Sequence, residues 1–137
     1  MTTITFIHPD SRSEIVEAED GASVMLAALT HGVDGIVVSN HGARNLDCAP
    51  GPTDVLPAIV AAVGDKIEIL ADSGVRRGAD IARFIALGAK GVMIGRATLY
   101  GVAIGGAPGA SRVLDLLHQQ LSATMGMLGA RRLSDIR

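Results

Sequence analysis

A histidine and an arginine stand three residues apart in the segment SNHGAR, residues 39–44. A histidine can exchange a proton near neutral pH, and an arginine can hold a carboxylate through two parallel hydrogen bonds. His41 and Arg44 are therefore candidates for a catalytic base and a carboxylate-binding group. The alternative is that the two side chains only hold their own loop together through local hydrogen bonds, and their spacing leaves both interpretations open.

Two later segments carry the features of a phosphate site. In ADSGVRRG, Asp72 is followed by Gly74 and Arg76, and in GVMIGR, Gly95 and Arg96 come just before an expected helix. The start of a helix offers free backbone N–H groups and the positive end of the helix dipole, which suit an anion. The alternative is a pair of solvated arginines and a helix start chosen for packing. Two consecutive segments of this kind favour the phosphate site.

Each of these segments follows a short apolar run that indicates a buried strand. The runs lie in GIVVSN, EILADSG and GVMIGRA, and the segments between them have helical patterns, at 54–64, 78–88 and 96–105. Buried strands that alternate with helices predict parallel βα units, whose ligands gather at the C-terminal ends of the strands. The fold class is therefore α/β.

A last helix is expected over residues 109–129. Its apolar positions recur at helical spacing on one face, so we expect that face to pack along the outside of the βα units. These positions are Leu114, Leu117, Leu121 and Leu128.

The first 31 residues have a different pattern. Short apolar runs at Ile4–Ile7 and Ile15–Ala18 flank turn-forming residues, which predicts a β-hairpin. An apolar stretch with helical spacing follows and ends near Gly32, so we expect a helix there. The chain thus divides into a hairpin and helix over 1–31 and a βα region over 32–137.

Composition limits the class of protein. The chain has 137 residues, 48% of them hydrophobic and 19% charged, which excludes a disordered chain, and its net charge of −2 offers no attraction to nucleic acid or a membrane surface. One cysteine, Cys48, excludes a disulfide within the chain, a zinc finger and a cysteine-bound iron–sulfur cluster, and we expect no metal site. No apolar run is long enough for a membrane span and no signal peptide is recognised, so a cytoplasmic location is expected.

The strings SNHGARNLD, ADSGVRRGADI and GVMIGRATLYG, in this order and spacing, resemble the FMN-dependent α-hydroxy acid dehydrogenase and oxidase family. The resemblance covers about residues 32–137 of a family that includes glycolate oxidase, and LDCA and GRATLYG look most like its mandelate dehydrogenase branch. It implies the last three βα units of a (β/α)₈ TIM barrel, which needs about 250 residues when closed. It also implies the cofactor FMN and a small 2-hydroxy acid as substrate, oxidised to the 2-oxo acid.

The resemblance implies a role for each matching residue. His41 matches the family's active-site base, and Arg44 matches the arginine that binds the substrate carboxylate. The remaining matches are contacts to FMN, at its ring, ribityl chain or phosphate. These are Ser39, Asp72, Ser73, Gly74, Arg76, Gly95 and Arg96.

Residues 1–35 resemble the opening hairpin and helix of a [2Fe-2S] ferredoxin of the β-grasp fold, without the cysteines that bind its cluster. The resemblance implies local structure and no electron transfer. The chain is then expected to be a chimera that lacks the first part of the barrel, with weak or no activity alone. Alternatives are a non-catalytic flavin- or phosphate-binding half-barrel and a purely structural chimera. Uncovered strand edges predict self-association or binding to a complementing half-barrel.

Overall fold

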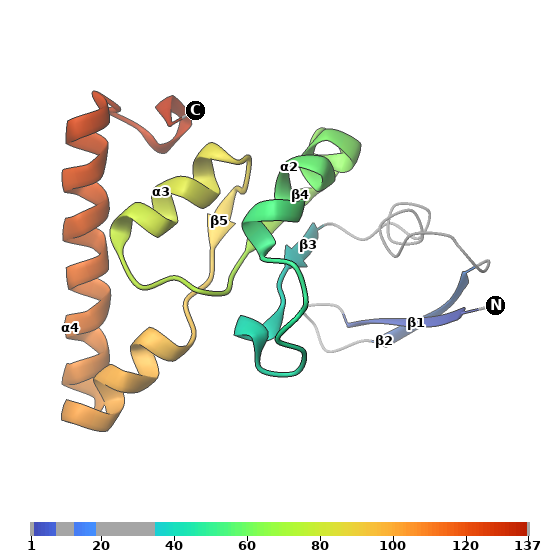
Figure 1. The fold of residues 1–137 in the computed structure, drawn as a ribbon, viewed down its shortest axis with the longest axis horizontal. Helices are drawn as coiled ribbons and strands as arrows, with labels where there is room; N and C mark the ends of the chain where they lie inside the picture. The colour runs from blue at the N-terminus through green and yellow to red at the C-terminus, as the bar shows by residue number, and fades with distance from the viewer. Residues whose placement is uncertain (1, 8–12, 19–34, 137) are drawn as a thin grey trace.

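The computed structural model describes residues 2–7, 13–18 and 35–136 (Figure 1). The first two stretches are β1 (Thr2–Ile7) and β2 (Ser13–Ala18), which pair antiparallel, with Thr2 opposite Ala18 and Ile7 opposite Ser13. The two predicted strands of the hairpin are therefore confirmed. The turn between them and the helix predicted to end near Gly32 lie outside the described residues.

Three short strands form a parallel sheet in the order β3-β4-β5. Val38 lies opposite Ala71, and Ala71 lies opposite Val92, so the three strands end at the same edge. A helix follows each strand, as the sequence predicts. The elements in chain order are β3 (Gly35–Val38), a short 3₁₀ turn (His41–Ala43), α2 (Pro52–Val63), β4 (Glu68–Ala71), α3 (Gly78–Ala86), β5 (Gly91–Val92) and α4 (Arg96–Leu128).

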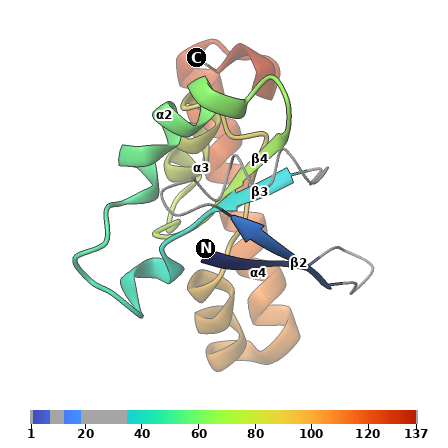
Figure 2. The same cartoon turned by 90° about the vertical axis from the view of Figure 1, so that its right-hand side faces the viewer.

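One face of this sheet is covered and the other is open among the described residues. Side chains of a strand alternate between its two faces. Val38, Ile69 and Ala71 are buried in a core with residues of α2 and α3, and Figure 2 shows α2 on one side of β3 and β4. On the opposite face, Val37 and, just after β5, Met93 are each 47% exposed.

Helix α4 consists of two halves that fold back on each other. The helix breaks at Gly105 and Gly106, where Gly106 has φ 60° and ψ −146°. The two halves then meet so closely that a Cβ on Gly101 would lie 2.5 Å from the carbonyl oxygen of Gly109. In Figure 1 the short first half leads into the turn and the long second half runs back beside α3.

The long half of α4 packs on α3 over only part of its length. Leu117 is buried, but Leu114 and Leu128 are 48% and 62% exposed, so the prediction that four leucines pack along one face is wrong for these two. The nine residues of α3 are too few to cover the whole apolar face of a helix this long.

In the described part of the chain, no helix is long and apolar enough to cross a membrane.

Candidate functional site

The turn after β3 holds three consecutive residues in the left-handed region. The φ angles of His41, Gly42 and Ala43 are 53°, 65° and 60°. Two of the three are not glycine, and such residues seldom adopt positive φ unless the surrounding structure holds them there. Local hydrogen bonds contribute, since Ser39 Oγ accepts from the His41 N–H at 3.1 Å and Asn40 Oδ1 accepts from the Ala43 N–H at 3.2 Å.

The peptide groups of Gly42 are held by residues from the other two strand ends. The Gly42 N–H donates to Ser73 Oγ at 3.0 Å, and the Gly42 carbonyl accepts from Arg96 Nη2 at 2.7 Å. A Cβ on Gly42 would collide with the Arg96 guanidinium, so a larger residue at this position would displace the guanidinium. We call this arrangement of Ser73, Gly42 and Arg96 the Gly42 clamp. It joins the ends of β3, β4 and β5.

The segment after β4 contributes an acid and a left-handed pair. Ser73 and Gly74 have φ 75° and 76°, and Ser73 Oγ donates to Asp72 Oδ1 at 2.7 Å. A Cβ on Gly74 would meet no atom within 4 Å, so its backbone faces open space. Asp72 and Ser73 are half-buried, whereas Arg76 is exposed.

The two helices that follow the candidate segments differ in the use of their first N–H groups. Before α3, Asp80 Oδ2 accepts from the Arg76 and Arg77 N–H groups, and Gln120 Oε1 accepts from Gly78 at 2.9 Å. Before α4, within the described ranges, the N–H groups of Arg96 and Ala97 take part in no hydrogen bond. The start of α4 is thus available to an anion, and the start of α3 is occupied by protein groups.

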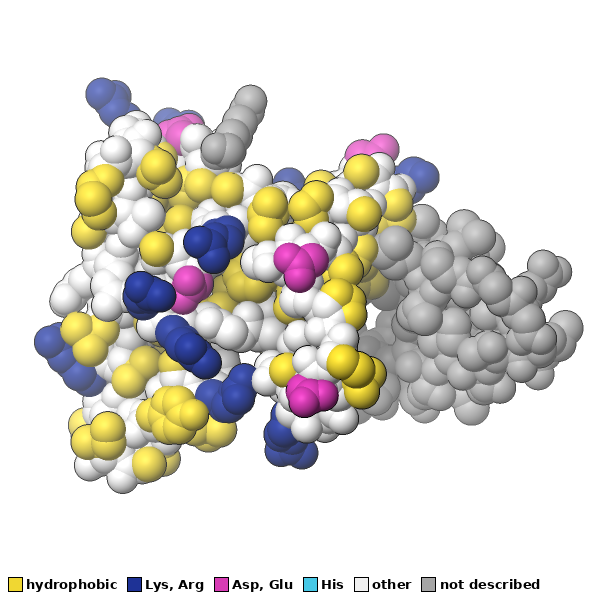
Figure 3. All heavy atoms as spheres, viewed as in Figure 1, with side chains coloured by type: hydrophobic (Ala, Val, Ile, Leu, Met, Phe, Trp, Pro, Cys, Tyr) yellow, Lys and Arg dark blue, Asp and Glu magenta, His cyan; other side chains and the backbone are white. Residues whose placement is uncertain are grey.

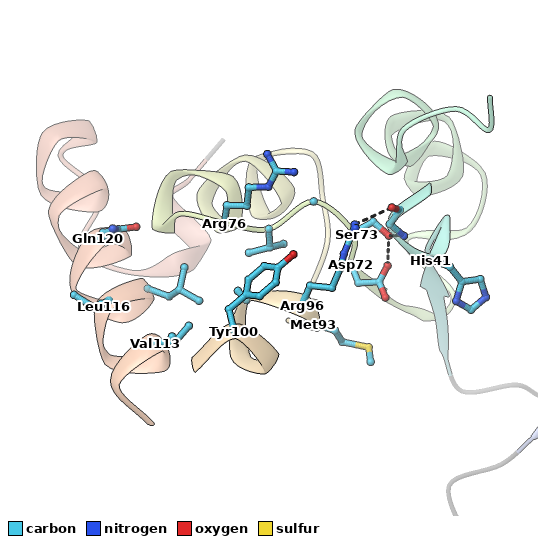
Figure 4. Close-up of a pocket in the computed structure, with 16 residues that line it drawn as sticks. His41, Asp72, Ser73, Arg76, Met93, Arg96, Tyr100, Val113, Leu116 and Gln120 are labelled. Carbon is cyan, nitrogen blue, oxygen red and sulfur yellow. Dashed lines mark hydrogen bonds between the residues drawn. The ribbon is translucent and has the colours of Figure 1, made fainter. Parts of the chain in front are cut away.

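The strand ends and α4 enclose a cleft of about 550 Å³ (Figure 4). One wall carries polar and glycine residues from the strand ends, and the other is mainly apolar and comes from α4. The lining residues include His41, Asp72, Ser73, Gly74, Arg76, Gly95 and Arg96 on the first wall and Tyr100, Val113, Leu116, Leu117 and Gln120 on the second.

Positive charge dominates the neighbouring surface. Figure 3 shows Lys and Arg side chains gathered on one face, with acidic side chains among and beside them. A second hollow of about 340 Å³ adjoins the cleft, and Arg76, Arg83 and Arg96 line it together with Asp80. Three guanidinium groups beside one carboxylate favour an anionic ligand.

The structure brings together most, but not all, of the residues predicted from the sequence. Seven of them line the cleft, whereas the exposed Ser39 and Arg44 do not. His41 lies at the edge, and in Figure 4 its ring is directed away from Asp72 and Ser73. Sequence reasoning missed Gln120 and the apolar wall, because helical spacing in α4 indicates packing and does not reveal a cleft.

Comparison with known proteins agrees with the motifs. Residues 15–137 match the family described as FMN-dependent dehydrogenase. The chain is 47% identical over 122 residues to an L-lactate oxidase of Nostoc sp., covering 89% of this chain and 32% of that protein.

Solved structures of similar proteins share the fold. A lactate oxidase of Pediococcus acidilactici matches with a TM-score of 0.77 and 41% identity, over 81% of this chain and 31% of that one. A mandelate oxidase variant with an FMN adduct matches with a TM-score of 0.76 and 40% identity, over 80% and 35% of the two chains. The chain therefore spans about a third of the length of these relatives.

The family match starts within β2, inside the segment that resembles a ferredoxin. The ferredoxin resemblance and the division at residue 32 stay predictions. Over the rest of the chain, the match includes all three strand ends that form the cleft. The chain belongs to the FMN-dependent dehydrogenase family.

Proposed function

We propose that this chain forms part of a site that binds FMN and oxidises a small 2-hydroxy acid to the 2-oxo acid. The observation that carries the proposal is the convergence of three consecutive strand ends on one cleft, joined by the Gly42 clamp. Relatives named for lactate and mandelate support 2-hydroxy acids as the substrate class.

The residues present fit a ligand with a phosphate and an apolar part. Arg76 and Arg96 supply two guanidinium groups, and the free N–H groups at the start of α4 supply further donors. Gly74 and Gly95 leave room for close approach, since a Cβ on either would meet nothing within 4 Å. When bound, FMN supplies the acceptor for two electrons.

Within this proposal, His41 accepts a proton from the substrate and Arg44 binds its carboxylate. Oxidation of the hydroxy acid to the oxo acid removes two electrons and two protons, so the reaction requires a base. Both side chains are exposed, so a substrate entering from solvent can reach them. Asp72 and Ser39 complete the set of proposed contacts, Asp72 from inside the cleft and Ser39 from beside the His41 turn.

We further propose that β3-β4-β5 and their helices correspond to the last three βα units of a (β/α)₈ barrel. The open face of the sheet, with Val37 and Met93 exposed, supports a partner that covers it, either a second copy or a complementing half-barrel. We also propose a cytoplasmic location, which the exposed thiol of Cys48 supports, because thiols stay reduced there.

The experiment is a titration with FMN followed by anaerobic addition of L-lactate or (S)-mandelate. The proposal predicts saturable binding and then loss of the visible flavin absorbance with one of the acids. Binding without loss of absorbance would favour a non-catalytic flavin-binding half-barrel. No binding would contradict the proposal and favour a purely structural chain.

A further inference from the structure

The hydroxyl of Ser73 has no hydrogen-bonding capacity left for a ligand. A serine hydroxyl has one donor and two acceptor positions. Ser73 Oγ donates to Asp72 Oδ1 at 2.7 Å and accepts from the N–H groups of Gly42 and Asn40 at 3.0 and 3.4 Å. All three positions are used, although Ser73 lines the cleft.

The backbone at Ser73 is also unusual for a serine. Its φ of 75° lies in the region that favours glycine, and the next residue, Gly74, has nearly the same angle. Glycine would adopt this conformation more easily, but it would lack the hydroxyl. The hydroxyl in turn holds a second left-handed segment, since it binds the N–H groups on both sides of His41.

We infer that Ser73 is a positioning residue that fixes the turn carrying His41 and is not itself a ligand of cofactor or substrate. The inference rests on the proposed function of His41 as the base. The hydrogen bonds that Ser73 Oγ accepts from Asn40 and Gly42 join residues 33 and 31 positions apart. They attach the turn after β3 to the end of β4. Asp72 orients the hydroxyl by accepting its hydrogen bond, which leaves both lone pairs of the hydroxyl oxygen for the two N–H groups.

The test measures amide hydrogen exchange in the 137-residue chain. Ser73→Ala removes the hydroxyl, and exchange at the Gly42 N–H should become about fivefold faster or more. Ser73→Gly removes the hydroxyl and also relieves the left-handed strain, so it should show the same loss of protection even if Ser73→Ala folds poorly. Ser111→Ala removes an exposed hydroxyl of α4 and should leave hydrogen exchange at the Gly42 N–H unchanged.

Two further readouts separate positioning from ligand binding. In both Ser73 variants the NMR signals of the His41 imidazole should shift while the affinity for FMN stays within about twofold of wild type. With an active preparation, kcat should fall and KM should change little. Unchanged exchange at Gly42 in both variants would overturn the inference, as would a loss of FMN affinity equal to that of Arg96→Ala. Absence of turnover in the wild-type chain would count against the proposed function alone, because exchange and the His41 signals still report on the turn.

Discussion

The Arg96 guanidinium donates a 2.7 Å hydrogen bond to the carbonyl oxygen of Gly42, although the two residues are 54 positions apart. The bond ties the start of α4 to the turn that carries His41. An arginine has five N–H donors, so one bond to Gly42 leaves others for a phosphate. The residue expected to bind the cofactor phosphate therefore also contacts the turn expected to hold the base.

Replacing Gly42 by alanine should disturb both the phosphate-binding position of Arg96 and the turn that carries His41. The new Cβ would collide with the Arg96 guanidinium, and an alanine at φ 65° is strained. We expect the affinity for FMN to fall about tenfold, because displacing Arg96 removes a charge-assisted bond to the phosphate. Fluorescence quenching during an FMN titration measures it.

The matched control for that variant is Gly126→Ala. Gly126 lies in α4, and a Cβ there would meet nothing within 4 Å. This change should leave FMN affinity unaltered and raise the free energy of unfolding by about 0.5–1 kcal/mol. If Gly42→Ala bound FMN as tightly as Gly126→Ala, this would contradict the expected coupling between the His41 turn and phosphate binding by Arg96.

Turnover should depend on His41 and Arg44. His41→Asn should lower the rate by about 10²–10⁴, the usual contribution of a general base, while FMN binding stays nearly intact. Arg44→Lys should mainly raise KM, since lysine cannot form the planar two-bond contact to a carboxylate. Steady-state kinetics with a 2-hydroxy acid gives both values.

His118→Asn provides the same chemical change at an exposed position of α4, outside the residues that line the cleft. Its rate should equal that of wild type. A His41→Asn variant that still reduced flavin at the parental rate would place the base elsewhere.

Much of the βα region could be predicted because its signals are local. Each strand is a short apolar run, and polar or glycine residues mark where it ends, as at Val38–Ser39 and Ala71–Asp72. The closeness of the three strand ends followed from the general behaviour of parallel strands. These features require no knowledge of contacts between distant residues.

The Gly42 clamp could not be predicted, because it depends on contacts across 31 and 54 residues and on the left-handed conformation of several positions. The exposure of Leu114 was missed for a related reason. Helical spacing shows which residues share a face, but the length of the partner helix α3 decides how much of that face is covered.

The contact between α3 and α4 should be sensitive to any side chain at Gly78. A Cβ there would overlap the backbone of Gln120 and Leu121, so the two helices would have to move apart, and α3 carries Phe84 of the core. We expect Gly78→Ala to lower the free energy of unfolding by about 1–3 kcal/mol, as measured by urea denaturation. A stability equal to wild type would contradict a close contact between α3 and α4 at Gly78.

The open face of the sheet should cause self-association. Light scattering after size exclusion at micromolar concentration should give a mass above the 14.1 kDa of a single chain. Val37→Lys, which places a charge on this face, should reduce the association. Met127→Lys adds the same charge at a position 82% exposed on the far end of α4 and should not. A monomer that is stable to dilution would contradict this expectation.

Binding of FMN through its phosphate at the strand ends is tested most directly by comparing FMN with riboflavin, which lacks the phosphate. Both ligands are titrated into the wild-type chain and into Arg96→Ala, with Arg112→Ala as a control for an exposed arginine that does not line the cleft. If the strand ends bind FMN through its phosphate, wild type and Arg112→Ala should bind FMN at least about tenfold more tightly than riboflavin, and Arg96→Ala should lose most of this preference. Equal affinity for the two ligands in the wild-type chain, or a preference that survives in Arg96→Ala, would contradict it.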